Sequence, residues 1–330
     1  MAAPASTPTI PHVRRSGLAL GLGSAAAFAT SGPFAKSLLD TGWSPGAAVT
    51  SRISLAAVVL AVPGALAMRG RWHLVRPNVG TIVLYGLLAI AGCQLFYFNA
   101  VQTLSVGVAL LLEYLGLILV VLWLWLRHGR RPGPWTALGV GLAVAGLVLV
   151  LDVTGGMEVD AAGVLWGLGA ATGLAAFFVI SADDSTGLPP IAMASGGMVV
   201  AAITLGVAGS LGAMPMERGN GNVELAGVHL PWPVPVLGMG IVAAVFAYAL
   251  GIAAARELGS KLAAFLGLTE VLFAVLFAWL LLDELPMVIQ LAGGVLIIGG
   301  VAAVRYEELI AVGDDEPLSV DAIGVEPLPD

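Results

Sequence analysis

Ten runs of mostly apolar residues follow one another along the chain, and this succession limits the possible folds more than any other feature. A helix needs roughly 20 apolar residues to cross the hydrocarbon core of a bilayer. The runs cover residues 16–38, 45–68, 78–99, 104–126, 134–151, 162–181, 189–210, 234–255, 260–282 and 287–304. The sequence therefore predicts an all-α integral membrane protein with ten transmembrane helices.

The composition indicates that lipid, rather than water, surrounds these runs. Of the 330 residues, 58% are hydrophobic and 11% are charged, whereas a soluble domain carries about 25% charged residues. A soluble core of this size cannot bury so much apolar surface. We therefore predict a multi-pass protein of the cell (plasma) membrane, with the lipid bilayer as its surroundings.

The basic residues orient the predicted helices. If the N-terminus is inside, the outer loops contain Arg218 alone, with Lys36 near the outer end of the first helix. The inner segments then contain Arg14, Arg15, Arg69, Arg71, Arg76, Arg127, Arg130, Arg131, Arg256, Lys261 and Arg305. Because basic residues accumulate in cytoplasmic loops, this division predicts that both termini are cytoplasmic. Residues 1–15 then form a cytoplasmic tail, and the acidic residues 305–330 are predicted to be a disordered cytoplasmic tail.

Short glycine-containing segments recur at an almost constant spacing. The segment GLALGLG at residues 17–23 matches GVLWGLG at 163–169, and GVGLAVAG at 139–146 matches GGVLIIGG at 293–300. These matches predict two repeats of five helices each, at residues 16–151 and 162–304. Five is an odd number, so the two repeats must cross the membrane in opposite directions. Inverted repeats of this kind are typical of secondary transporters, whose substrate site lies near the midplane between the halves.

Three longer segments resemble a known family. VGVALLLEYLG (106–116), GLTEVLFAVLFAWLLLDELP (267–286) and QLAGGVLIIGG (290–300) are similar to segments of the EamA-type transporters of the drug/metabolite transporter superfamily. The glutamate-tyrosine-glycine pattern also resembles the amino-acid exporter branch typified by threonine/homoserine exporters. This resemblance implies export of small metabolites. Two departures are Leu117, where relatives often have a proline that breaks the helix, and Glu284, which Arg127 matches in the first repeat.

Two glutamates lie near the middle of predicted membrane helices. Glu113 is the tenth residue of the fourth run, and Glu270 lies near the same depth in the ninth. Ionisable groups inside a membrane are costly and commonly functional. Apolar surroundings and a second carboxylate both favour the protonated form of a carboxyl group. We therefore predict that these two residues bind substrate or carry the coupled proton.

Arg52 is the eighth residue of the second run, and the helical rise places it about 4 Å further toward the outer face than Glu113. A rise of about 1.5 Å per residue brings the two charges close enough to predict an ion pair. Such a pair is either a substrate clamp or a structural tie, and it leaves Glu270 as the better proton carrier. Gln94 and Tyr97 share one face of the third run, with Tyr248 as their counterpart in the eighth. These three are predicted to line the cavity, or alternatively to pack between helices.

The leading hypothesis is a proton-coupled exporter of small metabolites such as amino acids, working by alternating access. A drug or cation extruder of the same fold is the alternative. A membrane enzyme acting on lipid-linked substrates is a different class, and a structural or sensor protein is a third. No catalytic motif, metal-ligand spacing or phosphate-binding GxxxxGK[ST] loop occurs in the sequence, and Cys93 is its single cysteine. We therefore predict no enzyme activity and no cofactor, metal, ATP or nucleic acid as a partner. The predicted energy source is the proton gradient, and the predicted oligomeric state is a monomer or homodimer.

Overall fold

The computed structural model describes residues 15–103, 106–129, 131–150, 160–219, 221–225, 227–282 and 287–314. Several predictions concern residues outside these ranges. They include most of both tails, the short connection between the third and fourth runs, and Glu284 of the DELP motif. Each of the ten predicted runs is helical over nearly all of its described part, apart from short turns such as those at Thr30, Leu115 and Leu268.

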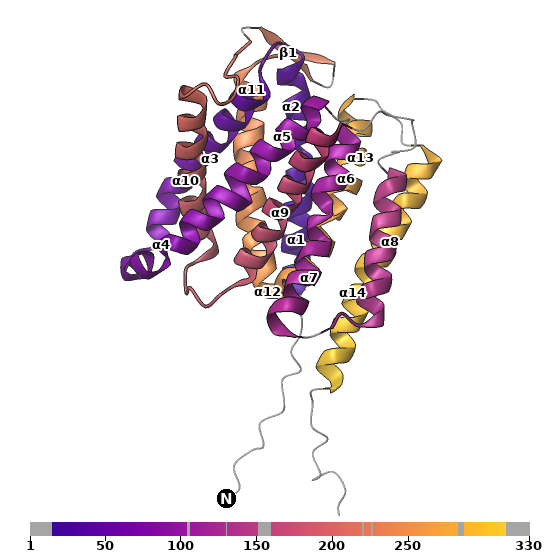
Figure 1. Cartoon of the computed structure of the whole chain (residues 1–330). Coiled ribbons are helices and arrows are strands. Elements are labelled where there is room, and N and C mark those ends of the chain that lie inside the picture. Colours follow the sequence, from indigo (N-terminus) through magenta and orange to yellow (C-terminus); the bar gives the residue numbers. More distant parts are fainter. Residues whose placement is uncertain are drawn as a thin grey trace, which may run out of the picture.

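The described chain forms a bundle of long apolar helices. Seven segments of the described residues are long and apolar enough to cross a membrane. They are Ser16–Leu39, Pro45–Ala67, Trp72–Ala100, Ala161–Ala182, Pro190–Ser210, Pro233–Gly267 and Val288–Glu307. Figure 1 shows the beginning of α1 and the end of α14 at the same end of the bundle, with the strand β1 at the other. The protein is therefore a multi-pass membrane protein.

The first half consists of helices and short helical turns. α3 illustrates how they begin, because the Ser44 side chain accepts a hydrogen bond from the backbone N–H of Ala47 and Pro45 occupies the first turn, both strong helix-start features. The elements are α1 (Arg15–Ala29), α2 (Ser31–Leu39), α3 (Pro45–Ala67), η1 (Trp72–Leu74), α4 (Val75–Leu84), η2 (Tyr85–Gly92), α5 (Cys93–Thr103), α6 (Val106–Tyr114), α7 (Gly116–His128) and α8 (Pro134–Val150).

The second half adds a small β-hairpin to the same kinds of helices. β1 (Asn222–Leu225) pairs antiparallel with β2 (Val228–Pro231), and Gly227 between them has a φ of 69° that suits glycine. The helices are α9 (Ala161–Ala182), α10 (Pro190–Ser210), α11 (Pro233–Leu237), η3 (Gly238–Phe246), α12 (Ala247–Gly267), α13 (Thr269–Leu282) and α14 (Val288–Asp314). The hairpin packs on α2, where Val223 joins Leu38 and Trp43 in a buried apolar cluster.

Irregular helix geometry occurs at similar places in the two halves. η2 and η3 are both π-helical and precede α5 and α12 respectively. Turns at Leu115 and Leu268 separate α6 from α7 and α12 from α13, and each turn residue donates its N–H three residues back, to Leu112 and Phe265. The helix thus tightens locally beside Glu113, with Leu115 still in the right-handed helical region (φ −61°, ψ −14°), and it does so with Leu117 rather than a proline after the glutamate.

Packing partners exchange between the halves. α1 packs on α12, while α9 packs on α5 and α6. The predicted repeat glycines follow this exchange, because a Cβ on Gly21 would overlap the Leu266 side chain, and one on Gly167 would lie 2.6 Å from Leu112. Real Cβ atoms do not approach so closely, so glycine is needed for these helices to touch.

The predicted glycine-rich pair GVGLAVAG and GGVLIIGG forms the contact between α8 and α14, which stand side by side at one edge of the bundle (Figure 1). A Cβ on Gly139 would lie 2.9 Å from the carbonyl oxygen of Gly300, and one on Gly300 would lie 2.8 Å from that of Gly139. The two repeats therefore contact each other backbone to backbone, through the residues that match in sequence.

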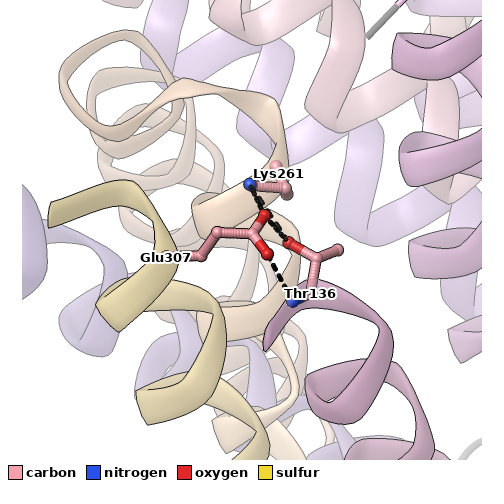
Figure 2. Close-up of polar contacts among 3 residues, drawn as sticks. All are labelled: Thr136, Lys261 and Glu307. Atoms are coloured by element: carbon pink, nitrogen blue, oxygen red, sulfur yellow. Dashed lines mark hydrogen bonds and ion pairs between the residues drawn. The ribbon is translucent and has the colours of Figure 1, made fainter. Parts of the chain in front are cut away.

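Helix α14 is longer than the sequence predicted. It continues to Asp314, so the prediction of disorder from residue 305 is wrong over 305–314. Figure 2 shows the polar contacts that hold this extension. Glu307 accepts a hydrogen bond from the backbone N–H of Thr136 at 2.9 Å and another from its hydroxyl, and Lys261 Nζ lies 3.4 Å from Glu307. Since Thr136 is at the start of α8, Glu307 caps one of the free N–H groups there.

Candidate functional site

A cavity of about 650 Å³ lies between the two halves of the bundle. Its walls come from α1, α2, α3, α5 and α6 of the first half and from α9, α12 and α13 of the second. All six side chains that the sequence singled out line it, namely Arg52, Gln94, Tyr97, Glu113, Tyr248 and Glu270. Residues that are far apart in the chain and unusual in membrane helices are thus gathered in one place.

Arg52 is 4% exposed and projects from the middle of α3. Its Nη1 donates to Ser31 Oγ at 3.1 Å and to Gln94 Oε1 at 3.2 Å, and its Nη2 donates to the carbonyl oxygen of Ala243. Its Nε is buried and has no hydrogen-bond acceptor within the described ranges. The guanidinium thus ties α3 to α2, α5 and η3 through neutral oxygens.

The predicted ion pair between Arg52 and Glu113 is not formed. Within the described part of the chain, no carboxylate oxygen lies within 4.0 Å of the Arg52 guanidinium. The helical rise predicted the depths of the two residues but not the rotation of their helices, which turns Arg52 toward Gln94 and Ser31. Both glutamates still act on Arg52 through space, without direct contact.

Glu113 has a partner that the sequence did not predict. The thiol of Cys93, at the start of α5, donates to Glu113 Oε1 at 3.2 Å and also approaches the carbonyl oxygen of Ala170 in α9, at 3.6 Å. Cys93 is itself buried and lines the cavity. A single cysteine cannot form a disulfide within the chain, but its thiol can still donate a hydrogen bond.

Glu270 lies in the first turn of α13, directly after the break at Leu268. The hydroxyl of Tyr114, from α6, interacts with its carboxyl group, and the charge of Glu113 is also within reach. Tyr114 follows Glu113 in sequence, so one short segment of α6 provides a carboxylate and a hydroxyl to the same cavity. Each glutamate therefore lies two residues from a tightened helical turn, at Leu115 and at Leu268 respectively.

Aromatic rings form an apolar part of the cavity wall. The rings of Phe28 and Tyr248 meet edge to face with centroids 5.0 Å apart, and Phe177 packs against Tyr248 at 5.5 Å. All three line the cavity. The site therefore combines an apolar wall with a few charged and polar groups, which is the usual composition of a small-molecule site.

The sequence did not predict five polar lining residues, namely Ser24, Ser31, Asp40, Cys93 and Tyr114. Asp40 lies between the first two predicted runs, and the other four are small or aromatic. Small or aromatic residues of this kind occur throughout membrane helices, so nothing in their spacing distinguishes them. Among the described residues, no group of three or more His, Cys, Asp and Glu side chains is arranged to hold a metal ion.

A family model for the EamA-like transporters matches residues 15–152 and again residues 161–306. The chain belongs to the EamA-like transporter family. The two matches coincide with the two predicted repeats. The family lies within the drug/metabolite transporter superfamily, so the chain is a membrane protein of a transporter family rather than of an enzyme family.

A comparison with solved structures shows the same fold. One solved structure, "Crystal structure of protein", superposes with a TM-score of 0.72 at 20% sequence identity, and the alignment covers 92% of this chain and 100% of the other. A search of curated proteins gives no match. The overall fold of this EamA-like chain is therefore shared with a protein of distant sequence.

Proposed function

We propose that this EamA-like chain is a secondary active transporter that exports small metabolites, such as amino acids, in exchange for protons. Ten helices in two inverted repeats would rock about the cavity by alternating access, with both termini in the cytoplasm of a cell whose plasma membrane holds the protein. No cofactor is required, because the proton gradient supplies the energy.

One observation carries this proposal. Two glutamates and an arginine from both repeats line one cavity of about 650 Å³. Charged groups at membrane depth are costly to retain without a function. A cavity of this volume is large enough for a small metabolite, and its position between the repeats is where alternating access requires a substrate site.

The ten-helix arrangement is supported by the helix breaks. Gly259, with φ 77° and ψ 161°, interrupts the helix that α12 otherwise continues. The turns at Leu115 and Leu268 divide the fourth and ninth proposed passes into shorter pieces, and the fifth is the shorter apolar helix Pro134–Leu149. These three passes and the seven long apolar segments of the described residues together make ten, and an even number agrees with chain ends at one end of the bundle (Figure 1).

Glu113 and Glu270 are the proposed proton carriers. The sequence alone favoured Glu270, because Arg52 was expected to keep Glu113 charged. Arg52 contacts neither carboxylate directly, so that reason for separating the two is lost. We propose that the two carboxyl groups act as a coupled pair and that the proton they exchange belongs to both.

Proteoliposomes with an imposed pH gradient test the proposal. The purified protein should move a member of an amino-acid and metabolite panel against its gradient when the lumen and medium differ in pH. Glu113→Gln and Glu270→Gln should each reduce that flux strongly, whereas Glu224→Gln, an exposed acid on β1, should leave it unchanged.

The outcomes separate the alternatives. Flux of quaternary ammonium dyes in place of metabolites would favour the drug or cation extruder. If the wild-type protein moves no solute, or if Glu113→Gln and Glu270→Gln both transport as well as wild type, the proposal of proton-coupled transport is wrong.

A further inference from the structure

Arg52 is a buried cation whose direct partners are all neutral. A guanidinium has five N–H donors, and the hydrogen bonds of Arg52 go to a serine hydroxyl, an amide oxygen and a backbone carbonyl. Its buried Nε–H has no acceptor within the described residues. Burying a charge without a counter-ion in contact is costly. If Arg52 only held helices together, a neutral hydrogen-bond donor would do so without that cost.

The charge distribution of the cavity wall is uneven. Arg52 is the one basic side chain among the described lining residues, and it comes from α3. The glutamates come from α6 and α13, and their direct partners are the Cys93 thiol and the Tyr114 hydroxyl. Positive and negative groups thus face the same cavity from different helices without neutralising one another by contact.

We infer that Arg52 binds the carboxylate of the transported substrate, and that this substrate is a zwitterion whose amine faces Glu113 and Glu270. This inference rests on the proposed transport function and narrows its substrate class. An incoming carboxylate would supply the anionic partner that Arg52 lacks, and a charge-assisted hydrogen bond to a guanidinium is among the stronger ones available. The aromatic wall of Phe28, Phe177 and Tyr248 would then hold the apolar side chain of the substrate.

The neutral partners of Arg52 fit this role. Ser31 and Gln94 fix the orientation of the guanidinium and leave its charge uncancelled. A carboxylate in the same position would cancel that charge. A purely cationic ligand would leave Arg52 without an anionic partner, whereas a ligand that carries a carboxylate supplies one.

Ligand binding to the purified protein, measured by thermal stabilisation at one pH without any gradient, tests the inference. The reference probe is L-leucine. In L-leucinamide a neutral amide replaces the carboxylate, and in 3-methylbutylamine the carboxylate is removed altogether. The fourth probe, 4-methylpentanoate, keeps the carboxylate but lacks the amine. L-threonine and L-threoninamide form a second matched pair. At least one amino acid should bind wild type about ten- to hundredfold more tightly than its amide, as expected for one charge-assisted hydrogen bond.

Variants assign that preference to Arg52. In Arg52→Gln the preference for the acid over the amide should fall below about twofold, and Arg52→Lys, which keeps the charge but not the planar fork, should retain an intermediate preference. Lys261→Gln, the matched control, should keep the full preference, because Lys261 does not line the cavity. A purely structural Arg52 would change stability without changing this ratio.

The results distinguish this inference from the proposed function. An equal affinity for acid and amide, an unchanged ratio in Arg52→Gln, or no binding of any probe would overturn the inference, even if proton-driven flux of another solute is observed. A preserved preference in a protein that shows no proton-driven flux would overturn the proposed function while leaving the carboxylate site in place.

Discussion

Lys261 and Arg52 are two basic residues of the same bundle with different surroundings. The Lys261 amine lies 3.4 Å from the carboxylate of Glu307 and 3.3 Å from the Thr136 hydroxyl, at the ends of α8, α12 and α14 (Figure 2). The Arg52 guanidinium contacts neutral oxygens and lines the cavity. One cation has an acid in contact, and the other does not.

The direct partners of Lys261 and Arg52 indicate which of the two positive charges is available to bind a ligand. Around Lys261, the carboxylate of Glu307 also satisfies the backbone N–H and hydroxyl of the buried Thr136. That cluster is complete, and its charges hold three helices together. Around Arg52, the protein fixes the orientation of the guanidinium but leaves its charge without an anion in contact. A complete cluster suits a structural role, whereas an incomplete one suits binding.

The largest effect is expected when both cavity acids lose their charge. The double variant Glu113→Gln/Glu270→Gln removes every proton-carrying carboxyl group that the proposal uses, so pH-gradient-driven flux in proteoliposomes should fall to the level of protein-free vesicles. Glu224→Gln serves as the matched control. A double variant with more than half the wild-type flux would show that protons are carried elsewhere.

The next largest effect is on stability, at the complete cluster. Glu307→Ala leaves the N–H and hydroxyl of Thr136, which is 0% exposed, without their acceptor. The cost of an unsatisfied buried group is about 1–3 kcal/mol. Thermal unfolding in detergent should therefore show a lower midpoint than for wild type or for Glu224→Ala. An unchanged midpoint would mean that the cluster in Figure 2 contributes nothing to stability.

A smaller stability change is expected at the incomplete cluster. Arg52→Gln removes the cost of burying a charge that has no anion in contact, and this gain offsets the loss of the hydrogen bonds to Ser31, Gln94 and Ala243. The unfolding free energy should stay within about 1 kcal/mol of wild type. A much larger loss, comparable with or greater than that of Glu307→Ala, would indicate that Arg52 has a structural role after all.

The smallest effect is expected at Cys93. Its thiol is a weak donor to Glu113, so Cys93→Ala should change the pH-driven flux by only about two- to threefold. Cys93→Ser, which keeps a donor in the same place, should be closer to wild type. A complete loss of flux in Cys93→Ala with normal folding would mean that the thiol, rather than the carboxylate, controls the site.

The sequence predicted which residues line the cavity better than it predicted how they meet. Charged and polar residues stand out in apolar helices, so Glu113, Glu270 and Arg52 could be singled out, and the matching glycines indicated two repeats. The helical rise then gave their depths. The rotation of each helix depends on packing from the other repeat, and this is why the Arg52–Glu113 contact was wrong.

Irregular backbone was the other feature that the sequence did not reveal. The turn at Leu115 forms without a proline, and the π-helical segments η2 and η3 have no special residues. Both depend on contacts between distant helices. Likewise, the helical extension of α14 depends on Glu307 meeting Thr136 of the other repeat, which composition alone cannot show.

A side-by-side flux measurement of Arg52→Gln and Lys261→Gln tests the central claim most directly. Both variants replace one basic residue by the same neutral one, and both are assayed in proteoliposomes with the same pH gradient and the same amino-acid substrate. Arg52→Gln should lose at least about tenfold in flux, as expected when a charge-assisted hydrogen bond to substrate is removed. Lys261→Gln should stay within about twofold of wild type. Equal losses in the two variants, or a loss confined to Lys261→Gln, would show that Arg52 does not bind the substrate.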